Sequence, residues 1–266
     1  MRKIWHISDV HLSMDRNMEP IKKMHERRWV IGSWTFTGYL EAMKEFAEAN
    51  IKKIDIVFIT GDILHDMSEK HIMYSLEWLR EIIPCQIVIC RGNHDKKWRV
   101  GRVKLNLNLP RFHIMGENEI TQLGPFTIGC YSDHAIKTGS MEEVDQKQVQ
   151  FALEVAKAAN NSSAKTPIMI GHYPVSVPTA ELIGEAGIKA YMSGHVHCTN
   201  GDEPDAVNGV YWKWYDLSAG LTDDKTFNKC FFSTGTVDVL RAKHGQPFKE
   251  IKQLQQFISI AIDAPC

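Results

Sequence analysis

Five short segments of the sequence combine an apolar run with a polar end made of Asp, His, Asn or Gly. The clearest is IVICRGNHD at residues 87–95, and the other four lie at residues 4–11, 56–62, 168–172 and 190–197. Carboxylate, imidazole and amide groups together suit borderline divalent ions such as Mn, Fe or Zn, whereas Ca prefers oxygen ligands alone. The pattern therefore indicates metal-dependent chemistry.

The polar ends fall where a sheet would present them to a ligand. An apolar run without alternation predicts a strand that is buried on both faces. Gly92 marks the end of such a strand, and ligand sites of open α/β sheets lie outside the carboxyl ends of the strands. Asp9 and His11 are two residues apart, as are His195 and His197. In extended backbone, side chains with this spacing point the same way and can face one ion.

The elements that must position these residues alternate along most of the chain. Helices are expected over residues 36–50, 68–82, 142–160 and 179–185, and a helical segment at 96–108. Strands are expected at 3–8, 53–60, 86–90, 112–115, 126–131, 167–170 and 189–193, followed by β segments at 210–217, 229–234, 236–241 and 256–262. Strands that alternate with helices and then follow one another predict a mixed-sheet core in a single α/β domain over residues 1–266.

Composition sets few limits on partners. The 266 residues carry 31 Lys and Arg against 32 Asp and Glu, so a net charge of −1 identifies no class of ligand. The six cysteines have no C-x-x-C spacing, and no apolar stretch approaches a membrane span. With no secretory signal in the sequence, a reduced, cytoplasmic setting without membrane contact is expected.

Taken in order, the polar ends resemble the motifs of the calcineurin-like metallophosphoesterases. The blocks are D-V-H at 9–11, G-D at 61–62, G-N-H-D at 92–95, G-H at 171–172 and G-H-V-H at 194–197. The resemblance implies the α/β fold of that superfamily, a four-layer α/β/β/α sandwich with two mixed sheets. It also implies two divalent or trivalent transition metal ions, Mn, Fe or Zn, at the carboxyl edge of the sheets.

The resemblance also implies a role for each matching residue. One ion would be held by Asp9, His11, Asp62 and His197, and the other by Asp62, Asn93, His172 and His195. Asp62 would bridge the two ions, which clamp a phosphate and lower the pKa of a bridging water. The resulting hydroxide would attack phosphorus, and His94 would donate to a phosphate oxygen or to the leaving group. His94 and Asp62 are therefore the candidate catalytic residues.

Several departures from the family pattern bear on the substrate. His65 stands where many members have the second Asp of G-D-x-x-D, and the protein-phosphatase form with its phosphate-binding Arg is absent. Arg91 occupies a place where proline is frequent, so Arg91 and His65 are candidate substrate-binding residues; a solvated charge is the alternative for Arg91. Gln146 or Gln148, followed by G-H-Y-P at 171–174, is similar to the cyclic-nucleotide and glycerophosphodiester phosphodiesterases.

The predicted function is therefore hydrolysis of a phosphodiester, with phosphomonoesters as further substrates. Alternatives are an SbcD-type DNA nuclease, which the opening I-S-D-V-H-L resembles, and a protein or small-molecule phosphomonoesterase. A non-catalytic scaffold is disfavoured because every ligand position is filled. The basic residues of 96–104 and the aromatic residues of 211–215 could hold a nucleotide or nucleic acid, or be a solvated helix face and sheet packing. The sequence predicts no oligomeric state.

Overall fold

The described part of the chain builds two five-stranded sheets. A computed structural model describes residues 2–7, 12, 14–18, 44, 47–48, 56–63, 69–95, 111–131, 143–173, 175–193, 231–234 and 260–262. Predicted segments at 96–108, 210–217 and 236–241 lie outside these ranges, as does most of the predicted helix at 36–50.

The first sheet has the order β10-β1-β2-β3-β4. Its strands are β1 (Arg2–Ile7), β2 (Ile56–Thr60), β3 (Gln86–Cys90), β4 (Phe112–Ile114) and β10 (Ile260–Ile262). Strands β1 to β4 are parallel to their neighbours, whereas β10 is antiparallel to β1. The carboxyl ends of β2 and β3 therefore meet at one edge.

The second sheet has the order β5-β6-β7-β8-β9. Its strands are β5 (Glu119–Leu123), β6 (Phe126–Cys130), β7 (Thr166–Ile170), β8 (Ala190–Ser193) and β9 (Phe231–Thr234). Strands β5 and β6 form an antiparallel hairpin, and the remaining pairs are parallel. Both sheets are thus mixed, as predicted.

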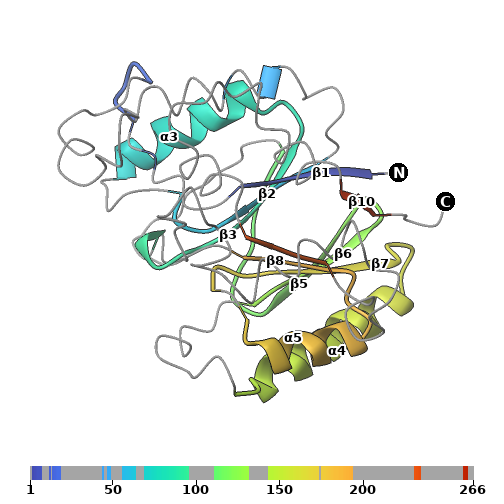
Figure 1. Ribbon diagram of the computed structural model, residues 1–266. Helices are drawn as coiled ribbons and strands as arrows, with labels where there is room; N and C mark the ends of the chain where they lie inside the picture. The colour runs from blue at the N-terminus through green and yellow to red at the C-terminus, as the bar shows by residue number, and fades with distance from the viewer. Residues whose placement is uncertain are drawn as a thin grey trace, which may run out of the picture.

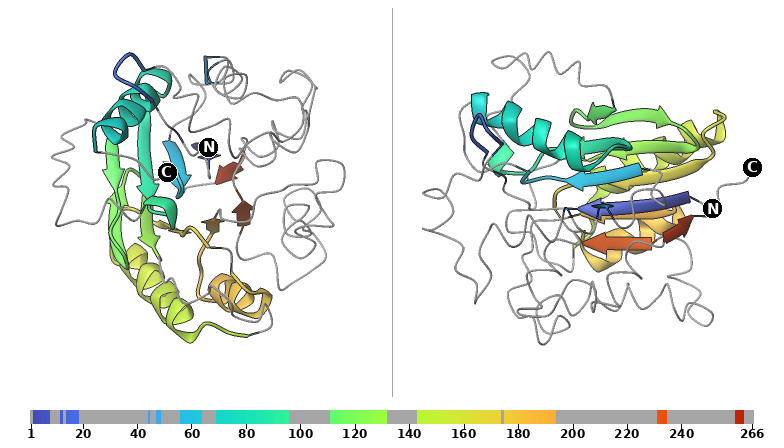
Figure 2. Two further views of the ribbon diagram at one scale, coloured as in Figure 1. Left: turned by 90° about the vertical axis from the view of Figure 1, so that its left-hand side faces the viewer. Right: turned by 90° about the horizontal axis from the view of Figure 1, so that it is seen from above.

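Helices cover the outer faces of both sheets. Figure 1 shows α3 (Glu69–Ile82) over the first sheet, and α4 (Gln146–Asn160) with α5 (Val177–Glu185) below the second. The two further views in Figure 2 show the same succession of layers. The described elements therefore confirm the α/β/β/α sandwich.

The alternation of side chains explains the two apolar layers around the second sheet. Ile168 and Ile170 of β7 belong to a buried cluster that joins the facing sides of the two sheets. Met169, between them, belongs to a second cluster with the helices α4 and α5. Across the sheet interface, the rings of Phe58 and Phe126 meet edge to face at 6.5 Å. Strands that are buried on both faces appear in the sequence as continuous apolar runs.

Two details differ from the sequence-based expectations. The strand β5 was not predicted, because its side chains are mostly half-buried and carry no apolar run. It joins β6 through a tight turn at Gly124, whose φ of +57° favours glycine. The two C-terminal strands, β9 and β10, do not pair with each other but complete different sheets.

Candidate metal centre

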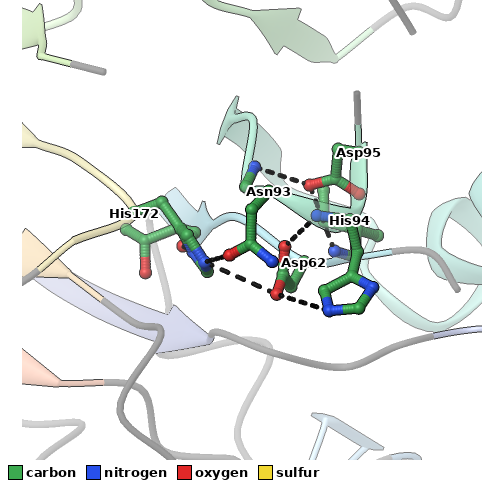
Figure 3. A network of polar contacts seen from close by, with 8 residues as sticks. Asp62, Asn93, His94, Asp95 and His172 are labelled. Carbon is green, nitrogen blue, oxygen red and sulfur yellow. Dashed lines mark hydrogen bonds and ion pairs between the residues drawn. The ribbon is translucent and has the colours of Figure 1, made fainter. Parts of the chain in front are cut away.

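Three of the predicted metal ligands lie side by side at the junction of the two sheets. Asp62 follows β2, Asn93 follows β3, and His172 follows β7 of the other sheet. The His172 Nε2 atom is 2.9 Å from Asn93 Oδ1 and 3.4 Å from Asp62 Oδ2. Figure 3 shows these groups pointing toward one another. The fold therefore brings together a carboxylate, an amide and an imidazole from positions up to 110 residues apart in the chain, the separation of Asp62 and His172.

The spacing of these donor atoms fits a shared metal ion. Ligands bound at about 2.1 Å in neighbouring octahedral or tetrahedral positions are about 3.0 to 3.4 Å from each other. The separations between His172 Nε2 and the two oxygens are 2.9 and 3.4 Å, within about 0.1 Å of that range. The donor set is also the mixed nitrogen and oxygen set of Mn, Fe or Zn.

Backbone geometry at Asp62 explains the glycine before it. Gly61 has a φ of +90° and Asp62 a φ of +49°, so the chain leaves β2 through two residues in the left-handed region. A Cβ on Gly61 would lie 2.8 Å from the Gly92 Cα atom, and a Cβ on Gly92 would lie 2.1 Å from Asp62 Oδ1. The two loops touch through their backbones, and each glycine makes room for the other loop.

A main-chain hydrogen bond orients His172. Its Nδ1 atom is 2.9 Å from the Thr60 carbonyl oxygen, and its side chain is 1% exposed. A carbonyl oxygen only accepts, so Nδ1 carries a proton and Nε2 faces Asn93 and Asp62. This arrangement is the usual one for a metal-binding histidine, whose second nitrogen is held by a backbone or carboxylate oxygen.

His94 lies at the rim of the same cluster. Its backbone N–H donates to Asp62 Oδ1 at 2.8 Å, and its imidazole Nε2 is 3.9 Å from Asp62 Oδ2. The side chain is 31% exposed, against 1% for His172. His94 is therefore the accessible histidine of the pair, which is the arrangement expected for a residue that meets substrate.

Asp95 joins the two loops and is completely buried. Its Oδ2 atom accepts from the backbone N–H of Gly92 at 2.8 Å and from that of Ile63 at 3.4 Å. The Asp95 N–H in turn donates to the Gly92 carbonyl at 3.2 Å. These contacts make Asp95 a cap for both loops.

Arg91 and Gln148 can also be placed. Arg91 is 17% exposed, and its Nη2 atom is 3.9 Å from Glu117 Oε1. Gln148, in the first turn of α4, is buried, and its Nε2 donates to the Tyr191 hydroxyl at 3.0 Å; within the described residues its Oε1 has no hydrogen-bond partner. Gln148 therefore belongs to the packing between α4 and the second sheet.

Tyr173 follows His172 and contacts its ring edge to face at 5.1 Å. Burial of the phenol, and after it the negative charge of Asp62, raises the pKa of Tyr173 above its ordinary value. The hydroxyl therefore stays protonated at neutral pH beside the cluster.

The other predicted site residues lie outside the described ranges: Asp9, His11, His65, His195 and His197. Within the described ranges, no group of three or more His, Cys, Asp or Glu side chains gathers into a metal site. The three ligands that lie side by side include two such side chains, Asp62 and His172, and the amide of Asn93 is the third. No described helix is long and apolar enough to cross a membrane.

Comparison with known proteins agrees with this geometry. The family model for calcineurin-like phosphoesterases matches residues 2–199, about three-quarters of the chain. The chain therefore belongs to the calcineurin-like phosphoesterase family. The description of that family is a phosphoesterase, an enzyme that hydrolyses phosphoric esters.

Solved structures of similar shape are remote in sequence. A purple acid phosphatase from yellow lupin, Lupinus luteus, is 16% identical with a TM-score of 0.43, over 74% of this chain and 38% of that one. A dimetal phosphatase from Danio rerio is 9% identical with a TM-score of 0.46, over 74% of this chain and 82% of that one. The chain thus spans well under half of the lupin enzyme.

Proposed function

We propose that this protein hydrolyses a phosphodiester at a dinuclear centre of Mn, Fe or Zn. The observation that carries the proposal is the convergence of Asp62, Asn93 and His172 from three strand ends, with His94 exposed beside them. Asp62, Asn93 and His172 would hold one ion together with His195. Asp62 would share the other ion with Asp9, His11 and His197.

The bound ions would supply positive charge against the phosphate oxygens and an activated water as nucleophile. The described residues prepare the site for this chemistry. Asp62 is held in place by the backbone N–H of His94, and it offers Oδ2 toward His172. The Thr60 carbonyl fixes the tautomer in which His172 directs Nε2 at the same point. The donor atoms of Asp62 and His172 are therefore directed at one point.

His94 is suited to act on the substrate itself. Its backbone is anchored to Asp62, whereas its imidazole is partly exposed at the rim. An imidazole in this place can donate a proton or hydrogen bond to the leaving oxygen, and this help matters most when the leaving group is poor. Alkyl diesters have such leaving groups, so His94 should matter more for alkyl than for activated aryl diesters.

Two features support a diester over a monoester. The sequence lacks the arginine of the protein-phosphatase motif, so a dianionic monoester loses one cationic partner. The segment from residue 146 to G-H-Y-P at 171–174 also resembles the phosphodiesterase branch. A nucleotide or nucleic acid is a substrate of the required charge, and Arg91 and His65 are candidates for contacting it.

The test compares kcat/KM for bis-p-nitrophenyl phosphate and p-nitrophenyl phosphate on one Mn²⁺-loaded preparation, with the chelated protein as the control. The diester should be hydrolysed at least as well as the monoester, and chelation should abolish both activities. A monoester preference above about tenfold, or about 1.4 kcal/mol of transition-state free energy, would reverse the assignment. The His94→Ala variant should lose turnover while keeping its metal, because His94 is assigned to the substrate.

A further inference from the structure

Thr60 joins two buried histidines that lie on different sheets. Its hydroxyl Oγ1 is 2.7 Å from His6 Nε2, and its carbonyl oxygen is 2.9 Å from His172 Nδ1. Both His6 and Thr60 are completely buried. We propose that His6 and Thr60 are positioning residues for the metal ligand His172, an inference that rests on the proposed metal centre.

Thr60 lies where its hydrogen bonds affect both the turn that carries Asp62 and the side chain of His172. It is the last residue of β2, and the two residues after it, Gly61 and Asp62, have left-handed backbone conformations. The turn that carries Asp62 therefore starts from the Thr60 carbonyl, the same group that accepts from His172. A shift of Thr60 would move two metal ligands at once.

His6 ties this point to the neighbouring strand. It lies in β1, which runs parallel to β2 with His6 opposite Phe58, two residues before Thr60. The bond from His6 Nε2 to the Thr60 hydroxyl therefore crosses the two strands near their carboxyl ends. A threonine hydroxyl that loses such a partner can bond to nearby backbone carbonyls instead, in competition with their native donors. His6 keeps the hydroxyl away from the carbonyls of the turn.

The consequence for His172 is a fixed tautomer and direction. Because the Thr60 carbonyl can only accept, it holds the proton on Nδ1 and leaves the lone pair on Nε2 for a metal. Partners of this kind around metal-binding histidines contribute about 10- to 100-fold to metal affinity. The described structure thus assigns a function to His6, which none of the motif blocks includes.

The test is a Co²⁺ titration followed by visible absorption and calorimetry, without substrate. Thr60→Val removes the hydroxyl at nearly constant volume, and His6→Leu removes the imidazole. Thr60→Ser and His6→Gln each keep a hydrogen-bonding group at the same reach. Thr127→Val is the matched control, because Thr127 is also a fully buried strand residue. Its hydroxyl donates to the Ala164 carbonyl at 2.7 Å, and no predicted metal ligand lies in that part of the chain.

Thr60→Val and His6→Leu should each weaken Co²⁺ binding by about tenfold or more, whereas Thr60→Ser, His6→Gln and Thr127→Val should bind like the wild type. The positioning role is overturned if Thr60→Val binds Co²⁺ as tightly as Thr127→Val, or if Thr60→Ser is as weak as Thr60→Val. If Thr60→Val does not fold by circular dichroism, the His6→Leu and His6→Gln pair decides in the same way. A wild-type protein that binds no Co²⁺ would instead overturn the metal centre itself.

Discussion

The two sheets hold their strand ends at the site by different means. At the ends of β2 and β3, backbone meets backbone through Gly61 and Gly92, and one buried carboxylate, Asp95, caps both loops. At the end of β7, the Gly171 backbone also lies close to its neighbours, since a Cβ there would meet the Tyr131 carbonyl oxygen at 2.7 Å, but side-chain groups add further connections. The Tyr191 hydroxyl there accepts from Gln148 Nε2 and donates to the Tyr173 carbonyl at 3.1 Å.

The same contrast continues into the helices behind the second sheet. Asp145 caps α4 through the N–H groups of Lys147 and Gln148, and its own N–H donates to the Thr179 hydroxyl. Ser176 caps α5 and is 2.7 Å from the same hydroxyl. Such a network has several members, so losing one leaves the others in place. At the first sheet, by contrast, the two loops touch through the backbones of Gly61 and Gly92, so a single added methyl group disturbs the contact.

The largest effect should come from Gly92→Ala. The new methyl group would lie 2.1 Å from Asp62 Oδ1 and 2.4 Å from the Asp62 nitrogen, so Asp62 or its loop must move. A displacement of about 1 Å at a reacting site can cost about 100-fold in rate, and we expect at least that loss in kcat/KM together with weaker Mn²⁺ binding. Gly116→Ala is the control, because its methyl group would meet only the Glu119 side chain, at 3.2 Å. Equal activity of the two variants would refute the tight contact.

The next effect should come from Asp95→Asn. The amide keeps the shape of the side chain but removes the charge that accepts from Gly92 and Ile63. Hydrogen bonds to a charged group contribute about 1.5–3 kcal/mol, so urea unfolding of the metal-free protein should show a loss of about 2 kcal/mol. Asp15→Asn is the control, because the hydrogen bond that Asp15 accepts from the Asn17 N–H is exposed, whereas Asp95 is buried. A loss no greater than that of the control would show that the cap is dispensable.

A smaller effect is expected from Tyr191→Phe at the second sheet. The change removes one hydroxyl that has two hydrogen bonds, and a net loss of about 1–2 kcal/mol in the free energy of unfolding is expected. Because other members of the network remain, kcat/KM should fall less than in Gly92→Ala. The contrast between the sheets would fail if Tyr191→Phe lost activity as severely as Gly92→Ala.

The smallest effect is a pH dependence at Tyr173. Its pKa is raised by burial and by the charge of Asp62, so in alkaline solution the unfolded chain releases this proton before the folded one does. The contribution to stability is therefore complete below about pH 10 and is lost as the pH rises through the folded pKa. In the metal-free protein, Tyr173→Phe should show a shallower fall of unfolding free energy above pH 10. Parallel curves for the two proteins would contradict the shift.

The sequence predicted the parts of this site that local chemistry determines. Continuous apolar runs predicted β2, β3 and β7, and the residues that follow these runs include the predicted ligands Asp62, Asn93 and His172. What it could not predict depends on contacts between distant segments. His6 looks like one polar residue inside a strand until its partner, 54 residues away, is known. In the same way, the glycines of the two loops share one contact that neither motif reveals alone.

Contacts within the fold also explain two features that the sequence did not predict. The strand β5 exists because β6 offers it an antiparallel partner and Gly124 a tight turn, and its own half-buried residues do not signal a strand. Gln148 lies early in a helix, and only the fold shows that its side chain contacts Tyr191. In both cases the tertiary environment decided the outcome.

The central claim is that Asp62, Asn93 and His172 bind one metal ion. Anomalous diffraction at the zinc edge, from crystals soaked in Zn²⁺, tests it most directly. We predict a peak about 2.0–2.2 Å from an Asp62 carboxylate oxygen, Asn93 Oδ1 and His172 Nε2, with a second peak that also contacts Asp62. A zinc-soaked crystal with no peak touching these three side chains would contradict the account.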